Sequence, residues 1–236
     1  ALAMNSASCA APTRPPSAYK LENFFPTATG AELRGGSQVH ATLGDTTDYV
    51  GSFLEYRNGT VERFFASIEG GIYDITTPAD PDVSPAPSVS GTLNSVWYST
   101  QFATTGGVFL VAVNASDPLE VYDGSLWYPI GSSDLAQLDY EDGTAAFSVG
   151  ETVTGATSGA TGVIVAMQGT VDNGFIVLKD IASGPFDAGE TITSAGGSAK
   201  AQDVEQTIFI GISGVDSEKL SFVWIYKNRL FFIEKD

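Results

Sequence analysis

Residues 108–128 read VFLVAVNASDPLEVYDGSLWY, and this stretch decides the class of fold. Residues 108–113 are an unbroken apolar run, which is typical of a strand that is covered on both faces. A polar loop at 114–118 leads to a second apolar run at 119–122. Asp123 and Gly124 then favour a tight turn before a third strand. Three strands joined by such short connections predict an antiparallel β-sheet.

The rest of the chain repeats this pattern. Apolar runs rich in aromatic residues occur at 61–67, 72–75, 222–226 and 230–233, each next to a turn sequence. Helical periodicity is hard to find, and 26 Gly and 11 Pro residues interrupt the chain every few positions. We therefore predict an all-β protein, and the continuous apolar runs predict strands that are buried on both faces.

Composition excludes several classes of function. The chain has 236 residues, of which 43% are hydrophobic, so it can bury one large core or two smaller ones. With 28 acidic and 11 basic residues its net charge is −17, which argues against gripping nucleic acid phosphates over a broad surface. One Cys and one His exclude an intrachain disulfide, a thiolate cluster for zinc or iron–sulfur, and a His-based metal site.

A block of the sequence recurs 39 residues later. Residues 147–154 (FSVGETVT) correspond to residues 186–193 (FDAGETIT). Each copy has an aromatic anchor, a glycine that can adopt positive φ, and an alternating strand of Thr with Val or Ile. The surrounding residues 139–206 are rich in Thr, Gly and Ala and poor in aromatics, unlike both flanks. This composition predicts a small β-barrel or sandwich module inserted into the chain.

A second, weaker repeat lies outside this block. A bulky strand, a turn and a strand ending in Tyr-Asp occur at 64–74 and at 109–123, and Phe231-Phe232 resembles another copy of the first strand. Phe64 and Phe109 are 45 residues apart, and Phe109 and Phe231 are 54 apart once the 68 residues of the insert are removed. Repeats of about 40–50 residues, each a small antiparallel sheet, indicate a propeller-like array of blades. A β-sandwich interrupted by an inserted domain explains the spacing almost as well.

The repeats divide the chain into four parts. We predict an extended, Pro-rich N-terminal arm at 1–18, a β-domain at 19–138, the inserted module at 139–206 and the continuation of the β-domain at 207–236. The arm is either a flexible tail or a segment that lies on a neighbouring subunit. The chain stops at Asp236 directly after a strong strand, so we expect the array of blades to be incomplete there. Neither a secretory signal nor an apolar run of about 20 residues is present, so we expect no membrane insertion.

The sequence offers few residues for chemistry, and we expect a protein that is not an enzyme and holds no cofactor or metal. His40 has no partner acid at a useful spacing, and Cys9 lies in the arm, so we interpret them as a surface histidine and a spectator thiol. A stretch that could bind calcium weakly contains Asp139, Glu141, Asp142 and Gly143. It lacks the ligand spacing of an EF-hand loop, so a solvated turn is the better interpretation.

Other candidate residues also have structural interpretations. Asp80 and Asp82 lie among prolines, which indicates an extended loop and not a pair of carboxylates for glycoside cleavage. Asn58-Gly59-Thr60 and Asn114-Ala115-Ser116 fit the glycosylation pattern, which is common by chance. Four aromatic residues could stack on sugars or on a partner subunit: Trp97, Tyr98, Trp127 and Tyr128. Core packing is the better interpretation for at least half of them.

Short segments outside the insert resemble a known family. They are 21–27 (LENFFPT), 33–37 (LRGGS), 56–59 (YRNG), 64–66 (FFA), 71–76 (GIYDIT), 102–104 (FAT), 121–124 (VYDG) and 224–232 (WIYKNRLFF). These segments look like those of tailed-phage virion structural proteins similar to the tail nozzle, or tail tubular, proteins of short-tailed phages. The repeated Gly-Glu-Thr block looks like the small β-modules that decorate phage tail proteins. The chain departs from the family by ending early.

The resemblance implies a structural protein of the virion, without catalytic residues, that builds a propeller-like ring below the portal and adaptor. We therefore expect a subunit of a cyclic, sixfold homo-oligomer that forms part of the DNA-ejection conduit and contacts adjacent tail proteins such as the adaptor and fibres. An acidic wall would repel genomic DNA and let it slide without specific binding, although high net charge also simply keeps a protein soluble. Two alternatives are a carbohydrate-binding propeller or depolymerase at the tail tip, and a secreted bacterial β-sandwich adhesin that folds with calcium.

Overall fold

The computed structural model describes residues 3–4, 18–20, 24–27, 30–33, 39–44, 48–80 and 82–236. These residues form strands, loops and one short 3₁₀ turn at Ser217–Lys219, with no α-helix among them, which confirms the predicted all-β class. In the described ranges no helix is long and apolar enough to cross a membrane. The chain divides into two compact units, Ala1–Val39 and His40–Asp236.

The first unit contains two short antiparallel strand pairs. β1 (Ala3–Met4) pairs with β2 (Ala18–Lys20), and β3 (Phe24–Thr27) pairs with β4 (Gly30–Leu33). Of the predicted arm at 1–18, only three residues are described, and they belong to the first pair. The remainder of the arm, with Cys9, lies outside the described residues.

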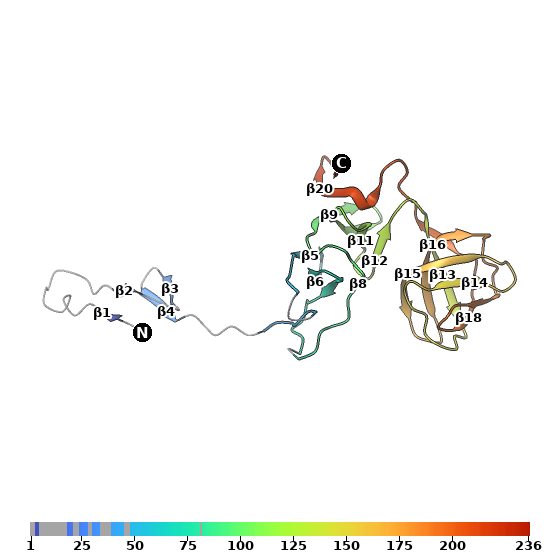
Figure 1. The fold of residues 1–236 in the computed structure, drawn as a ribbon, viewed down its shortest axis with the longest axis horizontal. Helices are drawn as coiled ribbons and strands as arrows, with labels where there is room; N and C mark the ends of the chain where they lie inside the picture. The colour runs from blue at the N-terminus through green and yellow to red at the C-terminus, as the bar shows by residue number, and fades with distance from the viewer. Residues whose placement is uncertain are drawn as a thin grey trace. The chain divides into compact units, whose positions relative to one another are not determined.

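The second unit contains two four-stranded antiparallel sheets (Figure 1). The first sheet consists of β5 (Ser52–Asn58), β6 (Val61–Ile68), β7 (Gly71–Asp74) and β8 (Val89–Ser90). The second sheet consists of β9 (Tyr98–Thr104), β10 (Gly107–Val113), β11 (Leu119–Tyr122) and β12 (Trp127–Ile130). Sequential strands are neighbours in both sheets, which is the form that a propeller blade takes.

The weaker sequence repeat marks equivalent strands. Phe64 lies in the second strand of the first sheet and Phe109 in the second strand of the second sheet. The Tyr-Asp pairs follow at the ends of the third strands, β7 and β11. Phe231 lies in the second strand of a hairpin formed by β20 (Leu220–Tyr226) and β21 (Arg229–Glu234). The repeat therefore marks the same strand order in the two four-stranded sheets, and the hairpin matches only their first two strands.

Strand β10 is buried on both faces, as its apolar run predicts. Leu110 and Ala112 belong to a core cluster with residues of the first sheet, among them Phe65. The intervening Val111 belongs to a cluster on the opposite face, with Val223 of the β20–β21 hairpin and with residues of the segment 135–209. The first two sheets therefore pack face to face, and the hairpin and residues of 135–209 cover the other face of the second sheet. The choice between a propeller-like array and an interrupted sandwich stays a prediction.

The part of the chain that follows the second sheet and precedes the hairpin folds into a closed β-barrel. Its strands are β13 (Leu135–Glu141), β14 (Thr152–Gly155), β15 (Thr161–Gly169), β16 (Gly174–Ala182), β17 (Thr191–Thr193) and β18 (Ser198–Ala201). The ring closes because β13 pairs with both β16 and β18, and β19 (Gln206–Phe209) adds to its side through β13. The predicted module boundaries at 139 and 206 stay a prediction, because residues 40–236 form one compact unit.

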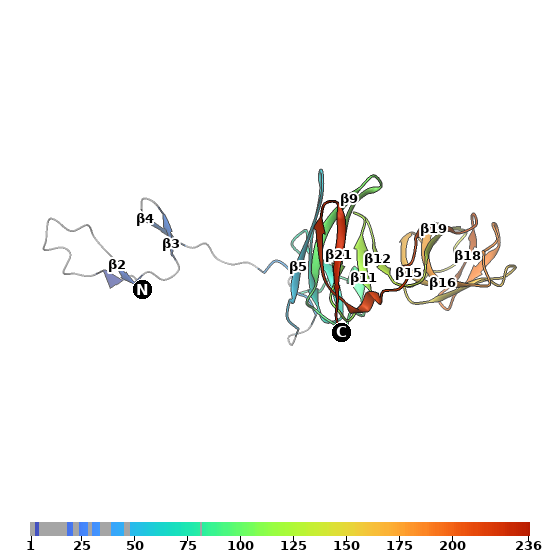
Figure 2. The same ribbon diagram turned by 90° about the horizontal axis from the view of Figure 1, so that it is seen from above.

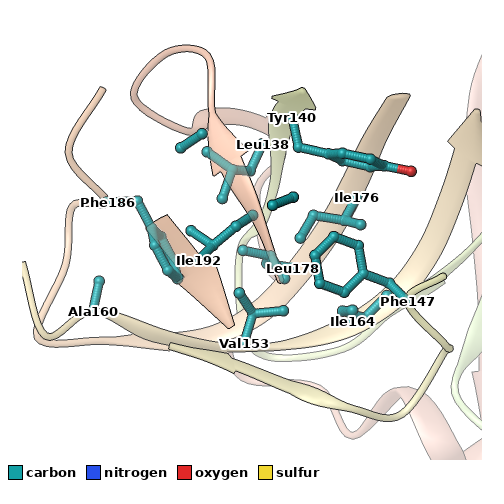
Figure 3. Packing of buried hydrophobic residues seen from close by; sticks show 12 residues of the cluster. Leu138, Tyr140, Phe147, Val153, Ala160, Ile164, Ile176, Leu178, Phe186 and Ile192 are labelled. Atoms are coloured by element: carbon teal, nitrogen blue, oxygen red, sulfur yellow. The ribbon is translucent and has the colours of Figure 1, made fainter. Parts of the chain in front are cut away.

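The 39-residue repeat builds the barrel core. The two aromatic anchors, Phe147 and Phe186, are both buried there, beside Ile164 and Ile192 respectively (Figure 3). Gly150 and Gly189 adopt φ angles of 91° and 78°, the left-handed conformation that the repeat predicts and that a side chain would strain. Both copies of the motif therefore make the same turn and bury the same kind of ring.

Candidate functional site

The sole histidine of the chain does not lie in a catalytic arrangement. His40 is exposed, and its Nε2 atom lies 2.7 Å from the backbone carbonyl oxygen of Ile75. This hydrogen bond ties the ring to the main chain and not to a nucleophile or an acid. The interpretation as a surface histidine agrees with this position.

The acidic residues at 139–142 lie on the barrel and are engaged by neighbours. Asp139 accepts a hydrogen bond from Gln137 Nε2 (2.7 Å), and Glu141 forms an ion pair with Lys200 (3.6 Å). Asp142 turns the chain with a φ of 56°. Within the described part of the chain, no group of three or more His, Cys, Asp or Glu side chains could hold a metal ion.

Asp80 and the second glycosylation pattern, at Asn114, also serve local structure. Asp80 accepts a hydrogen bond from the backbone amide of Asp82 (3.0 Å), which forms a turn. Asn58 is exposed where β5 ends. Asn114 is buried, accepts from the amide of Asp117 (2.8 Å) and donates to the carboxylate of the same residue (2.6 Å). Only the first pattern therefore leaves its asparagine free for a glycan.

Three of the four aromatic candidates are buried. Trp97 and Trp127 are 4% and 5% exposed in the core between the first two sheets, and Tyr128 is buried on the opposite face. Tyr98 alone is exposed, at 47%. This confirms the interpretation that at least half of these four aromatic residues pack in the core. These residues do not form the open aromatic groove that sugar binding would need.

Sequence reasoning missed a buried acid on β11. Glu120 is 4% exposed and lines a cavity of about 330 Å³ together with Trp127 and Lys179. Burial, with a smaller contribution from the nearby charge of Asp117, raises the pKa of Glu120 to about 8, and Lys179 opposes this shift. In the described residues its Oε2 atom has no hydrogen-bond partner. The available signal was a single charged residue inside the apolar run at 119–122.

The outer face of the β20–β21 hairpin is aromatic and exposed. Phe222, Trp224, Tyr226, Phe231 and Ile233 all point away from the core, and Tyr226 is the most exposed of them, at 58%. The rings form a continuous series in which Trp224 stacks on Phe231 with centroids 5.6 Å apart. Tyr98 of β9 extends the series through an edge contact with Phe222 (5.1 Å), and the hairpin lies beside β9 (Figure 2). We call these six residues, together with the exposed Lys227 and Arg229 at the turn of the hairpin, the hairpin face.

The prediction of two-sided burial is therefore wrong for β20. Its inward residues, such as Val223, pack on the second sheet, but the alternate residues have no cover from the described part of the chain. A similar exposed pair lies on the first sheet, where the rings of Phe53 and Phe64 stack 5.3 Å apart. With the neighbouring Glu55, Arg57 and Glu62 they form what we call the sheet face.

Comparisons of the chain with protein-family models, with curated proteins and with solved structures give no match. The features that bear on function are therefore those of the structure itself. They are the stacked antiparallel sheets, the closed barrel that follows the second sheet in the sequence, and the two exposed aromatic faces.

Proposed function

We propose that this protein is a structural subunit of a phage tail, resembling the nozzle proteins of short-tailed phages, and forms part of the DNA-ejection conduit as a cyclic oligomer. The observation that carries the proposal is the pair of uncovered aromatic faces on a stack of antiparallel sheets. Exposed apolar surface of this kind is typical of sites that bind a protein, a membrane or a ligand, and a neighbouring subunit is the partner that the proposal assigns to it.

The resemblance to nozzle proteins supports the same function. Six of the eight segments that carry it fall on β5 to β7, on β9 and β11, and on the hairpin. Segment 21–27 overlaps β3 of the first unit, and most of segment 33–37 lies outside the described residues. The six motifs coincide with framework strands, so what they support is a similar scaffold and not a catalytic site.

The charge of the chain suits a conduit. Each Lys or Arg contact with a phosphate adds affinity that must be broken before DNA can move. A subunit with a net charge of −17, repeated around an axis, repels the duplex and keeps the channel from binding its cargo. Adjacent tail proteins such as the adaptor and fibres would occupy the remaining outer surface.

The carbohydrate-binding alternative receives less support. Its expected cue was an open groove containing Trp97 and Trp127, and both side chains are buried in the core. The adhesin alternative expected calcium-dependent folding, and two of the carboxylates considered for calcium, Asp139 and Glu141, are engaged by barrel neighbours.

Negative-stain electron microscopy of the purified 236-residue chain tests the proposal. The expected images show closed rings with a central opening, and purified chain incubated with duplex DNA at physiological salt shows no retained DNA. Monomers at all concentrations, or stable binding of the duplex, would contradict a passive conduit.

A further inference from the structure

We infer that the hairpin face of one copy of the chain binds the sheet face of a second copy, so that copies associate head to tail. This inference rests on the proposed cyclic assembly and names the two surfaces that join. It follows from the apolar character, the charge and the positions of the two faces.

The hairpin face combines an aromatic centre with a basic tip. Trp224 and Phe231 form the centre, and Lys227 and Arg229 lie at the turn between the two strands. The Lys227 ammonium stands over the Tyr226 ring at 5.3 Å. No acidic residue occurs between Lys219 and Ile233, in a chain with 28 acidic residues. The face is therefore a local basic patch on an acidic molecule.

The sheet face has the complementary character. Phe53 and Phe64 form its apolar centre, and Phe53 is 61% exposed. Beside them is a hollow of about 330 Å³ whose charged lining residues are Glu55, Arg57, Glu62 and Arg63. Arg57 bridges both glutamates, at 2.6 Å and 3.5 Å, and Arg63 pairs with Asp74 at 3.7 Å. With Asp74, three acids and two bases leave this group with a net charge of −1.

Interfaces between proteins commonly place aromatic residues at the centre and charged groups at the rim. The two faces match this arrangement, with basic groups on one side and a net acidic group on the other. A second copy of this acidic chain is therefore the partner that the hairpin face fits, because opposite rim charges favour encounter and suppress wrong pairings.

The positions of the faces make the association head to tail. The inner side of the first sheet packs on one face of the second sheet, and the inner side of the hairpin packs on the other face. The hairpin face and the sheet face are thus the two ends of one stack. Joining unlike ends gives a heterologous contact, which closes into a ring or extends as a filament.

Charge reversal tests each face by sedimentation velocity of the full chain. We expect the double variants K227E/R229E and E55K/E62K each to weaken self-association by about tenfold or more. Trp224→Thr and Phe53→Thr should do the same through the apolar centre. Ile210→Thr, at a side chain that is 80% exposed and lies outside both faces, is the matched control and should associate like the parent chain. Circular dichroism melts verify that every variant folds.

Mixing the two charge-reversed variants is the decisive step. The acidic hairpin face of K227E/R229E then meets the basic sheet face of E55K/E62K, and the unchanged hairpin face of E55K/E62K still fits the unchanged sheet face of K227E/R229E. We therefore expect the two variants to co-assemble in a one-to-one ratio, with alternating copies, although neither variant assembles alone. Loss of association with hairpin variants only would indicate a symmetric hairpin-to-hairpin contact and overturn the inference. Quenching of Trp224 fluorescence by oligothymidylate, with unchanged sedimentation of all variants, would assign the face to single-stranded nucleic acid and also overturn it.

These outcomes separate the interface from the proposed function. Rings that persist in all face variants would refute the interface and leave the conduit standing. Open chains that require both faces, without ring closure, would support the interface and count against the conduit.

Discussion

Thr154 of β14 and Thr193 of β17 are Cα partners in the barrel, although they are equivalent residues of the 39-residue repeat. An antiparallel pair formed by equivalent residues relates the two copies by a local twofold axis. Backbone hydrogen bonds obey the same relation, because Gly150 donates to Ile164 as Gly189 donates to Ala201, both at 2.8 Å. The barrel is therefore assembled from two copies of one supersecondary unit.

This symmetry predicts equal contributions from the two aromatic anchors. Phe147→Ala and Phe186→Ala should each lower the free energy of unfolding of the barrel by about 3–5 kcal/mol, because each leaves a cavity in the same core. Urea unfolding followed by circular dichroism measures the loss. Val149→Ala, at an exposed side chain, is the control and should stay within about 0.5 kcal/mol of the parent. A near-neutral result at either phenylalanine would contradict the shared core.

The repeat is not symmetric in its glutamates. The Glu190 carboxylate accepts hydrogen bonds from the amides of Thr157, Ser158 and Asp187 and from the Ser158 hydroxyl, at 2.7–3.0 Å. The equivalent Glu151 accepts one from the Ser194 hydroxyl (2.6 Å). Glu190→Gln should therefore cost about 2 kcal/mol and Glu151→Gln less than about 1 kcal/mol in urea unfolding. Equal costs would contradict this difference.

The same contacts give Glu190 a defined pH dependence. Burial alone would raise the pKa of Glu190, but its hydrogen bonds with Ser158, Thr157 and Asp187 lower the pKa overall. Its stabilisation is therefore complete above the ordinary glutamate pKa and is lost as pH falls through the lower pKa of the folded state. The gap in stability between the parent and Glu190→Gln should narrow in acid, and a gap that widens would contradict the assignment.

Glu120 has the opposite dependence. Its pKa in the folded state is about 8, against an ordinary value of 4.5, so the unfolded chain releases the proton first as pH rises. The contribution of this residue to the free energy of unfolding therefore decreases as the pH rises from 4.5 to about 8. Glu120→Gln should melt at the parent temperature near pH 4.5 and at a higher temperature than the parent near pH 8. An equal difference at both pH values would show that Glu120 does not titrate in this range.

Local patterns predicted the strands, and burial depended on what packs against them. The run at 108–113 is covered on both faces because the first sheet and the hairpin lie on either side of β10. The run at 222–226 is also continuous and apolar, but its outer residues stay exposed. An apolar run indicates that a strand can be buried on both faces. Whether both faces are buried depends on which distant segments of the chain pack against them.

Long-range pairing was equally hidden in the sequence. The repeat at 147 and 186 predicted a separate set of strands, with positive φ at Gly150 and Gly189. Closure of the barrel depends on β13 pairing with β16 at Leu138 and Ile176, and neither strand belongs to the repeat motif. Glu120 was missed for a related reason, because its burial results from the packing of β11 and not from its own polarity.

Fluorescence distinguishes the exposed tryptophan from the two buried ones. Trp224 is half-exposed on the hairpin face, whereas Trp97 and Trp127 lie in the core. Acrylamide should quench Trp224 in the monomer, and Trp224→Phe should remove most of that quenching. Raising the protein concentration should protect Trp224, because the proposed assembly would cover the hairpin face. Quenching that is independent of concentration while oligomers form would place the contact elsewhere.

The central claim is that this chain forms an acidic, DNA-conducting ring. A cryo-electron microscopy map of the assembled protein at side-chain resolution tests it most directly. The account predicts a closed ring whose channel is lined mainly by Asp and Glu side chains. A channel lined by Lys and Arg, or the absence of any ring, would contradict it.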